Sequence, residues 1–105
     1  MAMVVELTDS NFSETIKEGV TLVDFWAPWC APCMMQGPIV ERVAKKVGDK
    51  AKVAKVNVDE AQRAATELGI RAIPTVIVFK DGQVVQPFVG VTQESTLLSA
   101  IDKAQ

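Results

Sequence analysis

The chain contains no histidine and no tyrosine, and only two of its 105 residues are cysteines. Histidine is the commonest general base near neutral pH and the commonest metal ligand, so its absence excludes both roles. A structural zinc site needs four ligands, and only a dimer that pooled the cysteines of both chains could complete one. Two cysteines are also too few for a disulfide scaffold. The two thiols are therefore the residues whose role has to be found.

Long apolar runs and a strong excess of one charge are missing too. The net charge of −2 gives no general attraction to nucleic acid or to an anionic membrane. No segment approaches the length of a membrane span. The first ten residues, MAMVVELTDS, lack the basic start and the apolar core of a secretory signal. If the chain is complete, we expect one cytoplasmic domain over residues 1–105, monomeric, with no nucleic-acid or membrane partner.

Short apolar segments alternate with helical patterns along the chain. Runs typical of strands cover residues 4–7, 21–27, 52–59, 75–80 and 84–89. Helical patterns cover residues 8–18, 32–47 and 60–68, and a last helix follows Thr92. This order predicts parallel strands joined by right-handed crossovers, with an antiparallel hairpin at the end. The expected fold is α/β, a mixed sheet of about five strands with four helices on both faces.

Single residues predict where some of these elements begin and end. Thr8 or Asp9 is expected to cap the first helix, and Thr92 the last. Asp81-Gly82 is a strong signal for a two-residue hairpin. Pro87 cannot donate to a neighbouring strand, so the strand that contains it is expected at the edge of the sheet.

Both cysteines lie where the long central strand gives way to a helix. Cys30 and Cys33 are separated only by Ala31 and Pro32. Side chains three residues apart at a helix start share one face, close enough to form a disulfide. Free N–H groups and the positive end of the helix dipole stabilise an anion there, and the thiolate is the reactive form of cysteine. Pro32 suits the first turn because its missing N–H would have had no partner.

A purely structural role for the cysteine pair is a weaker interpretation than redox chemistry. A disulfide that closes so short a loop stabilises the fold by only about 2 kcal/mol. Two unrelated free thiols would more often be scattered through the core. Asp24 adds to the case for chemistry, because it lies within the apolar run 22–26, where burial disfavours its charged form.

Several segments, taken in order, resemble one family. VDFWAPWCAPC (residues 23–33) is similar to the active-site strand and Trp-Cys-Gly-Pro-Cys motif of the thioredoxin family. KVNVDE (55–60) resembles its third strand, GIRAIPTVIVFKDG (69–82) its cis-proline segment and hairpin, and FVG (88–90) the edge of its substrate groove. The resemblance runs from end to end. It implies the thioredoxin fold and a thiol-disulfide oxidoreductase.

The resemblance also implies roles for single residues. Cys30 matches the family's exposed nucleophile, Cys33 its buried resolving thiol, and Asp24 the buried acid that takes the second thiol's proton. Three positions would tune the redox pair: Ala31, Pro32 and Lys55. Four match the groove that holds an extended substrate segment: Trp29, Ile73, Pro74 and Gly90.

Partners follow from the same resemblance. Family members carry no cofactor or metal of their own. They receive electrons from thioredoxin reductase, an NADPH-dependent flavoprotein, and pass them to protein disulfides in enzymes such as reductases and peroxidases. Ala31, Met34 and Ala72 stand where the family more often has glycine, a basic residue and glycine. These departures leave the redox poise and the choice of partners open.

Two alternatives remain at this point. A glutaredoxin-like or disulfide-forming relative is disfavoured, because strong oxidants and isomerases of the superfamily carry a histidine between the cysteines. A redox-independent structural subunit or binding module of a larger assembly stays open, because one chain could serve both purposes.

Overall fold

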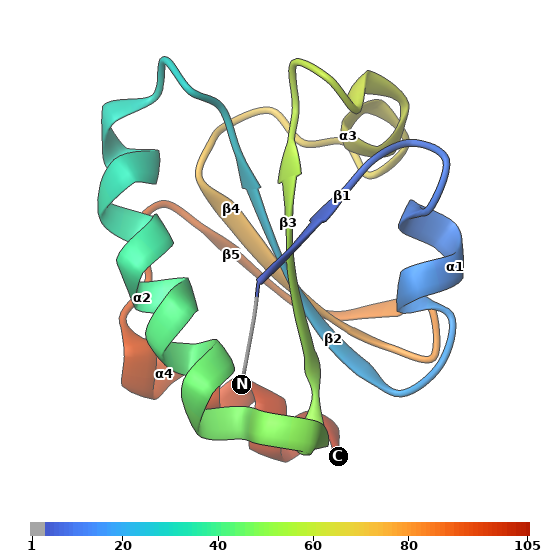
Figure 1. The fold of residues 1–105 in the computed structure, drawn as a ribbon, viewed down its shortest axis with the longest axis vertical. Coiled ribbons are helices and arrows are strands. Elements are labelled where there is room, and N and C mark those ends of the chain that lie inside the picture. Colours follow the sequence, from blue (N-terminus) through green and yellow to red (C-terminus); the bar gives the residue numbers. More distant parts are fainter. Residues whose placement is uncertain (1–3) are drawn as a thin grey trace.

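Five strands and four helices make up the fold of residues 4–105, which a computed structural model describes (Figure 1). The strands are β1 (Val5–Leu7), β2 (Val20–Trp26), β3 (Lys52–Asn57), β4 (Thr75–Lys80) and β5 (Gln83–Val89). The helices are α1 (Phe12–Ile16), α2 (Ala31–Val47), α3 (Gln62–Glu67) and α4 (Glu94–Ala104), and a short 3-10 turn η1 (Gly48–Lys50) follows α2. The predicted α/β fold is confirmed.

The sheet has the order β1-β3-β2-β4-β5, so β2 lies at its centre. β1, β3 and β2 run parallel, whereas β4 runs antiparallel to both β2 and β5. The expectation of parallel pairing up to the final hairpin is therefore wrong for β4. The six residues of α3 rise only about 9 Å, too little to carry the chain back along a strand of about 20 Å. As a result, β4 begins beside Phe25, near the end of β2.

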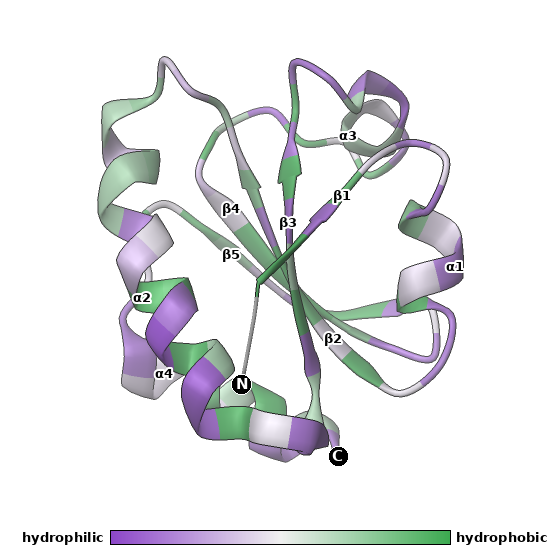
Figure 2. Ribbon diagram, in the orientation of Figure 1, coloured by the Kyte–Doolittle hydropathy of each residue, from purple (hydrophilic) through white to green (hydrophobic). Residues whose placement is uncertain are grey.

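Each face of the sheet buries its own apolar cluster. α2 and α4 cover one face, and α1 and α3 cover the other (Figure 1). Successive residues of β2 point to opposite faces, so Leu22 packs with the first pair of helices and Val23 with the second. Figure 2 shows hydrophobic and hydrophilic bands alternating along α2, as expected for a helix with one buried face. Asp24 has the same orientation as Leu22 and points toward the α2 side.

The predicted helix caps are wrong at both ends of the chain. Asn11, rather than Thr8 or Asp9, precedes α1, and its Oδ1 accepts a hydrogen bond from the Thr8 N–H at 2.7 Å. Asp9 instead accepts hydrogen bonds from the start of α3. Gln93, rather than Thr92, precedes α4, and no side chain caps that helix. A long-range contact uses the Asp9 carboxylate, whereas the Thr92 hydroxyl bonds back to the Gly90 carbonyl oxygen instead of capping α4.

The hairpin and the edge strand agree with expectation. Asp81 and Gly82 have φ angles of 50° and 85°, and a two-residue turn of this kind needs positive φ at both positions. β5, which contains Pro87, pairs only with β4 and forms one edge of the sheet. Among residues 4–105, no helix is both long enough and apolar enough to cross a membrane.

Candidate active site

Cys30 and Cys33 form a disulfide at the start of α2. The central strand β2 ends at Trp26, and a short turn brings Cys30 to the N-cap position of the helix. Its Sγ accepts a hydrogen bond from the backbone N–H of Cys33 at 3.2 Å. Pro32 lies in the first turn, where its missing N–H breaks no helical bond. An N–H that already points at Cys30 Sγ favours a negative charge on that atom once the disulfide is reduced.

Both sulfur-bearing residues are buried in this disulfide form. Cys30 is 5% exposed and Cys33 is 2% exposed. The expectation of an exposed Cys30 is therefore wrong for the oxidised protein, because Ala27 and Ile73 pack against the pair. Cys30 Sγ also lies 3.7 Å from the carbonyl oxygen of Ile73.

The four residues expected to form the groove lie on three loops of the fold. Trp29 is 70% exposed, and its indole N–H donates a hydrogen bond to Asp59 Oδ2 at 2.9 Å. Ile73 and Pro74 are joined by a cis peptide bond directly before β4. The N–H of Gly90, just after β5, donates to the carbonyl oxygen of Pro74 at 2.8 Å. Ile73 touches the cysteine cluster, and Gly90 is bonded to its neighbour Pro74.

Asp24 is buried in the middle of β2, with 2% of its surface exposed. Burial raises the pKa of its carboxyl from an ordinary 3.8 to about 7; Lys55 lowers this pKa and Glu6 raises it, both by smaller amounts. Lys55 is its register partner on β3, and Glu6 pairs in turn with Lys55 on β1. The Lys55 ammonium lies 5.3 Å from the centre of the Trp26 ring and 4.0 Å from Glu6 Oε1. Asp24 therefore changes protonation near neutral pH.

A cavity of about 590 Å³ lies beside Asp24 and the disulfide. Asp24 and Cys33 both line it, and exposed residues of α2, including Glu41 and Lys45, stand at its rim. Within residues 4–105, Asp24 Oδ1 has no hydrogen-bond partner. The carboxyl can therefore exchange a proton with a group that enters this cavity.

The remaining positions of interest lie on the surface. Ala31 and Pro32, at the start of α2, and Met34, one residue after the disulfide, are exposed. Ala72 is exposed as well, just before Ile73. Residues 4–105 contain no group of three or more side chains of the kinds that bind a metal ion.

Comparison with known proteins identifies the family. The family model for thioredoxin matches residues 3–103. The chain belongs to the thioredoxin family. It is 45% identical over 100 residues to a thioredoxin of Bacillus subtilis, which covers 95% of this chain and 96% of the relative. Thioredoxin 1 of Synechococcus elongatus is also 45% identical, over 105 residues and 98% of each chain.

Solved structures agree. The thioredoxin of Malassezia sympodialis (Mala s 13) matches with a TM-score of 0.87 at 39% identity, over 99% of this chain and 92% of that one. A mutant thioredoxin from Halobacterium salinarum matches with a TM-score of 0.86 at 35% identity, over 95% and 88%. With the Cys30–Cys33 pair in place, the chain is a thiol-disulfide oxidoreductase that acts as a protein-disulfide reductase.

Sequence reasoning missed two residues that hold the site together. Asp59 anchors Trp29, and Gln36 binds Thr92 from 56 positions away. No local pattern marks an exposed aspartate or a helical glutamine as a long-range partner. The isolated polar residue on the buried face of α2 was the one available signal for Gln36.

Proposed function

We propose that the chain carries electrons from a thioredoxin reductase, an NADPH-dependent flavoprotein, to disulfides of cytoplasmic proteins, and that it acts as a single-domain monomer. The observation that carries this proposal is the Cys30–Cys33 disulfide at the start of α2, with the buried Asp24 lining a cavity next to Cys33. Reductases and peroxidases that form a disulfide in each turnover are suitable substrates. No bound cofactor takes part, because the two thiols hold both electrons.

The reaction proceeds by two exchanges of sulfur. In the reduced protein, the Cys30 thiolate attacks one sulfur of the substrate disulfide, and the other substrate sulfur leaves as a thiolate. The Cys33 thiolate then attacks Cys30 Sγ, which re-forms the Cys30–Cys33 disulfide and releases the second substrate sulfur. Two electrons pass to the substrate, which takes up two protons. The reductase restores the dithiol by the same exchange in reverse.

Asp24 is proposed as the acceptor of the Cys33 proton. Cys33 is 2% exposed, so its proton has poor access to bulk water. A carboxyl whose burial raises its pKa to about 7 is partly deprotonated at neutral pH and can take a proton there. Lys55, which lowers that pKa, tunes how often Asp24 is ready to accept.

The surrounding residues are proposed to hold the substrate. Trp29, Ile73, Pro74 and Gly90 would bind an extended segment on either side of the substrate disulfide. Ala31 and Pro32 shape the turn between the thiols and would set the redox potential. No observation on residues 4–105 favours the alternative, a redox-independent structural subunit.

Reduction of insulin by dithiothreitol tests the proposal. The protein should accelerate the precipitation of insulin chains, and Cys30→Ser should abolish the acceleration. A rate equal to that of dithiothreitol alone would contradict the function. A second assay follows NADPH consumption with a bacterial thioredoxin reductase. Failure of that assay alone would contradict the proposed reductase partner but not the oxidoreductase activity.

A further inference from the structure

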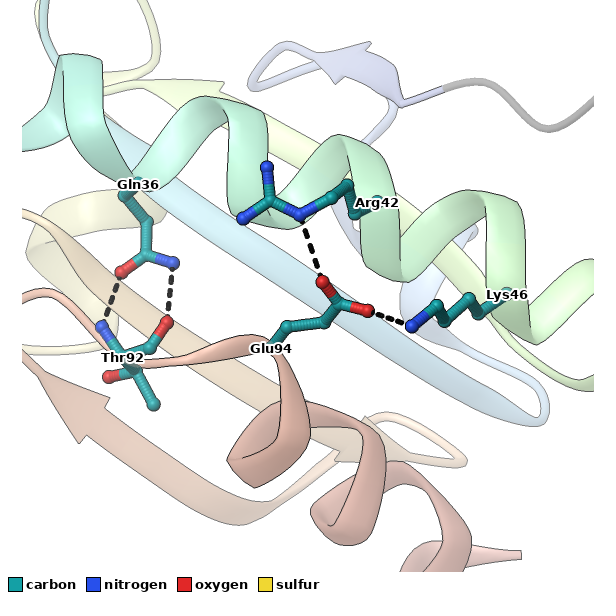
Figure 3. A network of polar contacts seen from close by, with 5 residues as sticks. All are labelled: Gln36, Arg42, Lys46, Thr92 and Glu94. Carbon is teal, nitrogen blue, oxygen red and sulfur yellow. Dashed lines mark hydrogen bonds and ion pairs between the residues drawn. The ribbon is translucent and has the colours of Figure 1, made fainter.

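Gln36 is a fully buried polar residue on the helix that carries the active site. It lies one turn after Cys33, and none of its surface is exposed. Its side-chain amide makes two hydrogen bonds to the backbone of one residue in the loop before α4 (Figure 3). Gln36 Nε2 donates to the Thr92 carbonyl oxygen at 3.0 Å, and Gln36 Oε1 accepts from the Thr92 N–H at 2.7 Å. Both ends of the amide are therefore used.

Thr92 continues this contact toward the substrate groove. Its hydroxyl donates a hydrogen bond to the carbonyl oxygen of Gly90 at 3.0 Å. The N–H of Gly90 donates in turn to the carbonyl oxygen of Pro74 at 2.8 Å. Ile73, the residue before Pro74, has its own carbonyl oxygen 3.7 Å from Cys30 Sγ. A continuous polar chain thus runs from α2 through Thr92 and Gly90 to Pro74, and it ends beside the disulfide.

We propose that Gln36 is a positioning residue that fixes the far wall of the substrate groove relative to the disulfide. The inference rests on the proposed function, because it concerns the groove that receives the substrate. Gln36 and Cys33 share one rigid helix, whereas Gly90 belongs to an irregular loop after an edge strand. The bidentate amide holds this loop at one distance from the thiols. A substrate segment then binds a preformed surface, and less of the binding free energy is lost in ordering the loop.

A neighbouring set of contacts offers a matched control. Glu94, at the start of α4, forms ion pairs with Arg42 and Lys46 of α2 (Figure 3). These pairs join the same helix to the same end of α4 at its exposed side, and they touch neither Thr92 nor Gly90. Glu94→Gln weakens the attachment of α4 to α2 and leaves the Gln36–Thr92 contact in place.

Gln36→Met is the informative variant, because methionine has nearly the length of glutamine and no amide. We expect KM for insulin to rise by about fivefold to tenfold, the equivalent of one ordinary hydrogen bond or slightly more. The kcat should stay within about twofold of the parent value, because the amide contacts neither sulfur. For the same reason, the equilibrium constant with glutathione should also stay within about twofold of the parent value. Glu94→Gln should leave KM unchanged.

Thr92→Val tests whether the chain of hydrogen bonds acts as a unit. Valine keeps the backbone groups that Gln36 binds and removes only the hydroxyl that reaches Gly90. It should also raise KM, and the Gln36→Met and Thr92→Val effects should be less than additive in the double variant. Gln36→Met and Glu94→Gln should combine additively.

Amide hydrogen exchange at Gly90 gives a readout that needs no activity. Exchange should accelerate in Gln36→Met and stay at the parent rate in Glu94→Gln. Unchanged exchange overturns the positioning role, whether or not insulin is reduced. Faster exchange with an unchanged KM shows a structural contact only and also overturns it. A parent protein that fails to reduce insulin contradicts the proposed function, and the exchange result still decides whether Gln36 holds the loop.

Discussion

Asp24 lies on a face of β2 whose neighbouring positions, Val20 and Leu22, are buried apolar residues. Leu22, two residues earlier on the same face, is fully buried in the core. A carboxylate at this depth costs stability, since burial disfavours the charged form. The fold tolerates Asp24 because the carboxyl can stay protonated to about pH 7. A residue that lowers stability at the site of chemistry is typical of function rather than packing.

The parent protein should lose stability as the pH rises toward 7, and Asp24→Asn should abolish this loss. The native carboxyl has a pKa of about 7 and the unfolded one about 3.8, so the folded protein holds a proton that the unfolded chain has lost. The contribution of this proton to the free energy of unfolding is fully present below pH 3.8 and is lost as the pH rises through 7. Above pH 7 the variant should be more stable than the parent, by roughly 4 kcal/mol at most. Urea unfolding at several pH values measures this.

Asp49→Asn is the control for that experiment. Asp49 is an exposed aspartate in η1, so its replacement should leave the pH profile of the parent unchanged. A parent curve that is flat between pH 4 and pH 7 would contradict a buried, protonated Asp24. The same Asp24→Asn protein should also release the mixed disulfide more slowly near neutral pH.

The two cysteines should behave unequally toward a substrate. Cys33→Ser should accumulate a mixed disulfide through Cys30, because no thiol remains to resolve it. Cys30→Ser should accumulate none, because Cys33 is more deeply buried and faces the cavity with Asp24. Intact-mass spectrometry after exposure to oxidised insulin distinguishes the two. Adducts on the Cys30→Ser protein would reverse the assignment.

At the scale of elements, Asp9 joins two helices that are far apart in sequence. Its carboxylate accepts hydrogen bonds from the N–H groups of Ala64 at 2.9 Å and Arg63 at 3.3 Å. These residues begin α3, where N–H groups have no partner inside the helix. Asp9 therefore caps α3 from the loop before α1. The negative charge also suits the positive end of that helix.

Asp9→Ala should destabilise the protein by about 1 kcal/mol, the usual cost of losing a helix cap. The urea midpoint should fall with an unchanged slope, because the same surface is exposed on unfolding. Asp9→Asn keeps an acceptor oxygen and should lose less. Ser10→Ala, at the exposed neighbour, should change little. Equal effects of Asp9→Ala and Ser10→Ala would mean that the α3 contact contributes nothing.

The elements themselves were predictable, because hydrophobic period and turn chemistry are local. The strand around Asp24, the hairpin at Asp81-Gly82 and the edge position of Pro87 follow from such patterns. The caps failed because the Asp9 carboxylate bonds to α3, 55 positions away, and the Thr92 hydroxyl bonds back to the Gly90 carbonyl oxygen. The direction of β4 failed because it depends on how far α3 carries the chain. Cys30, Cys33 and Asp24 were indicated by their positions in the sequence, the other site residues came from family motifs, and Gln36 lay outside both.

At the scale of the whole molecule, the exposed edge of β5 offers a surface for self-association. This strand carries three valines that are about half exposed or more: Val84, Val85 and Val89. An unpaired edge with apolar side chains can recruit a second copy. Pro87 interrupts this edge, because it has no N–H to offer to another strand. The proposed monomer depends in part on this one residue.

Pro87→Thr should increase association without affecting the active site. Threonine restores an N–H and favours the extended strand, so dimers or larger species should appear at high concentration in light scattering. Gln83→Thr, on the same strand and with Pro87 retained, should remain as the parent. Identical scattering by parent and Pro87→Thr protein would show that the proline does not protect the edge.

The cavity beside Asp24 is lined by Cys33 but not by Cys30 or by the proposed groove residues. In the proposed function, electrons enter and leave through Cys30. Protons would reach Asp24 through the cavity, which Glu41 and Lys45 of α2 also line. A partner that covers Cys30 would then leave the proposed proton route in contact with solvent. One small protein can serve partners of many shapes, because none of them has to leave a gap for the proton.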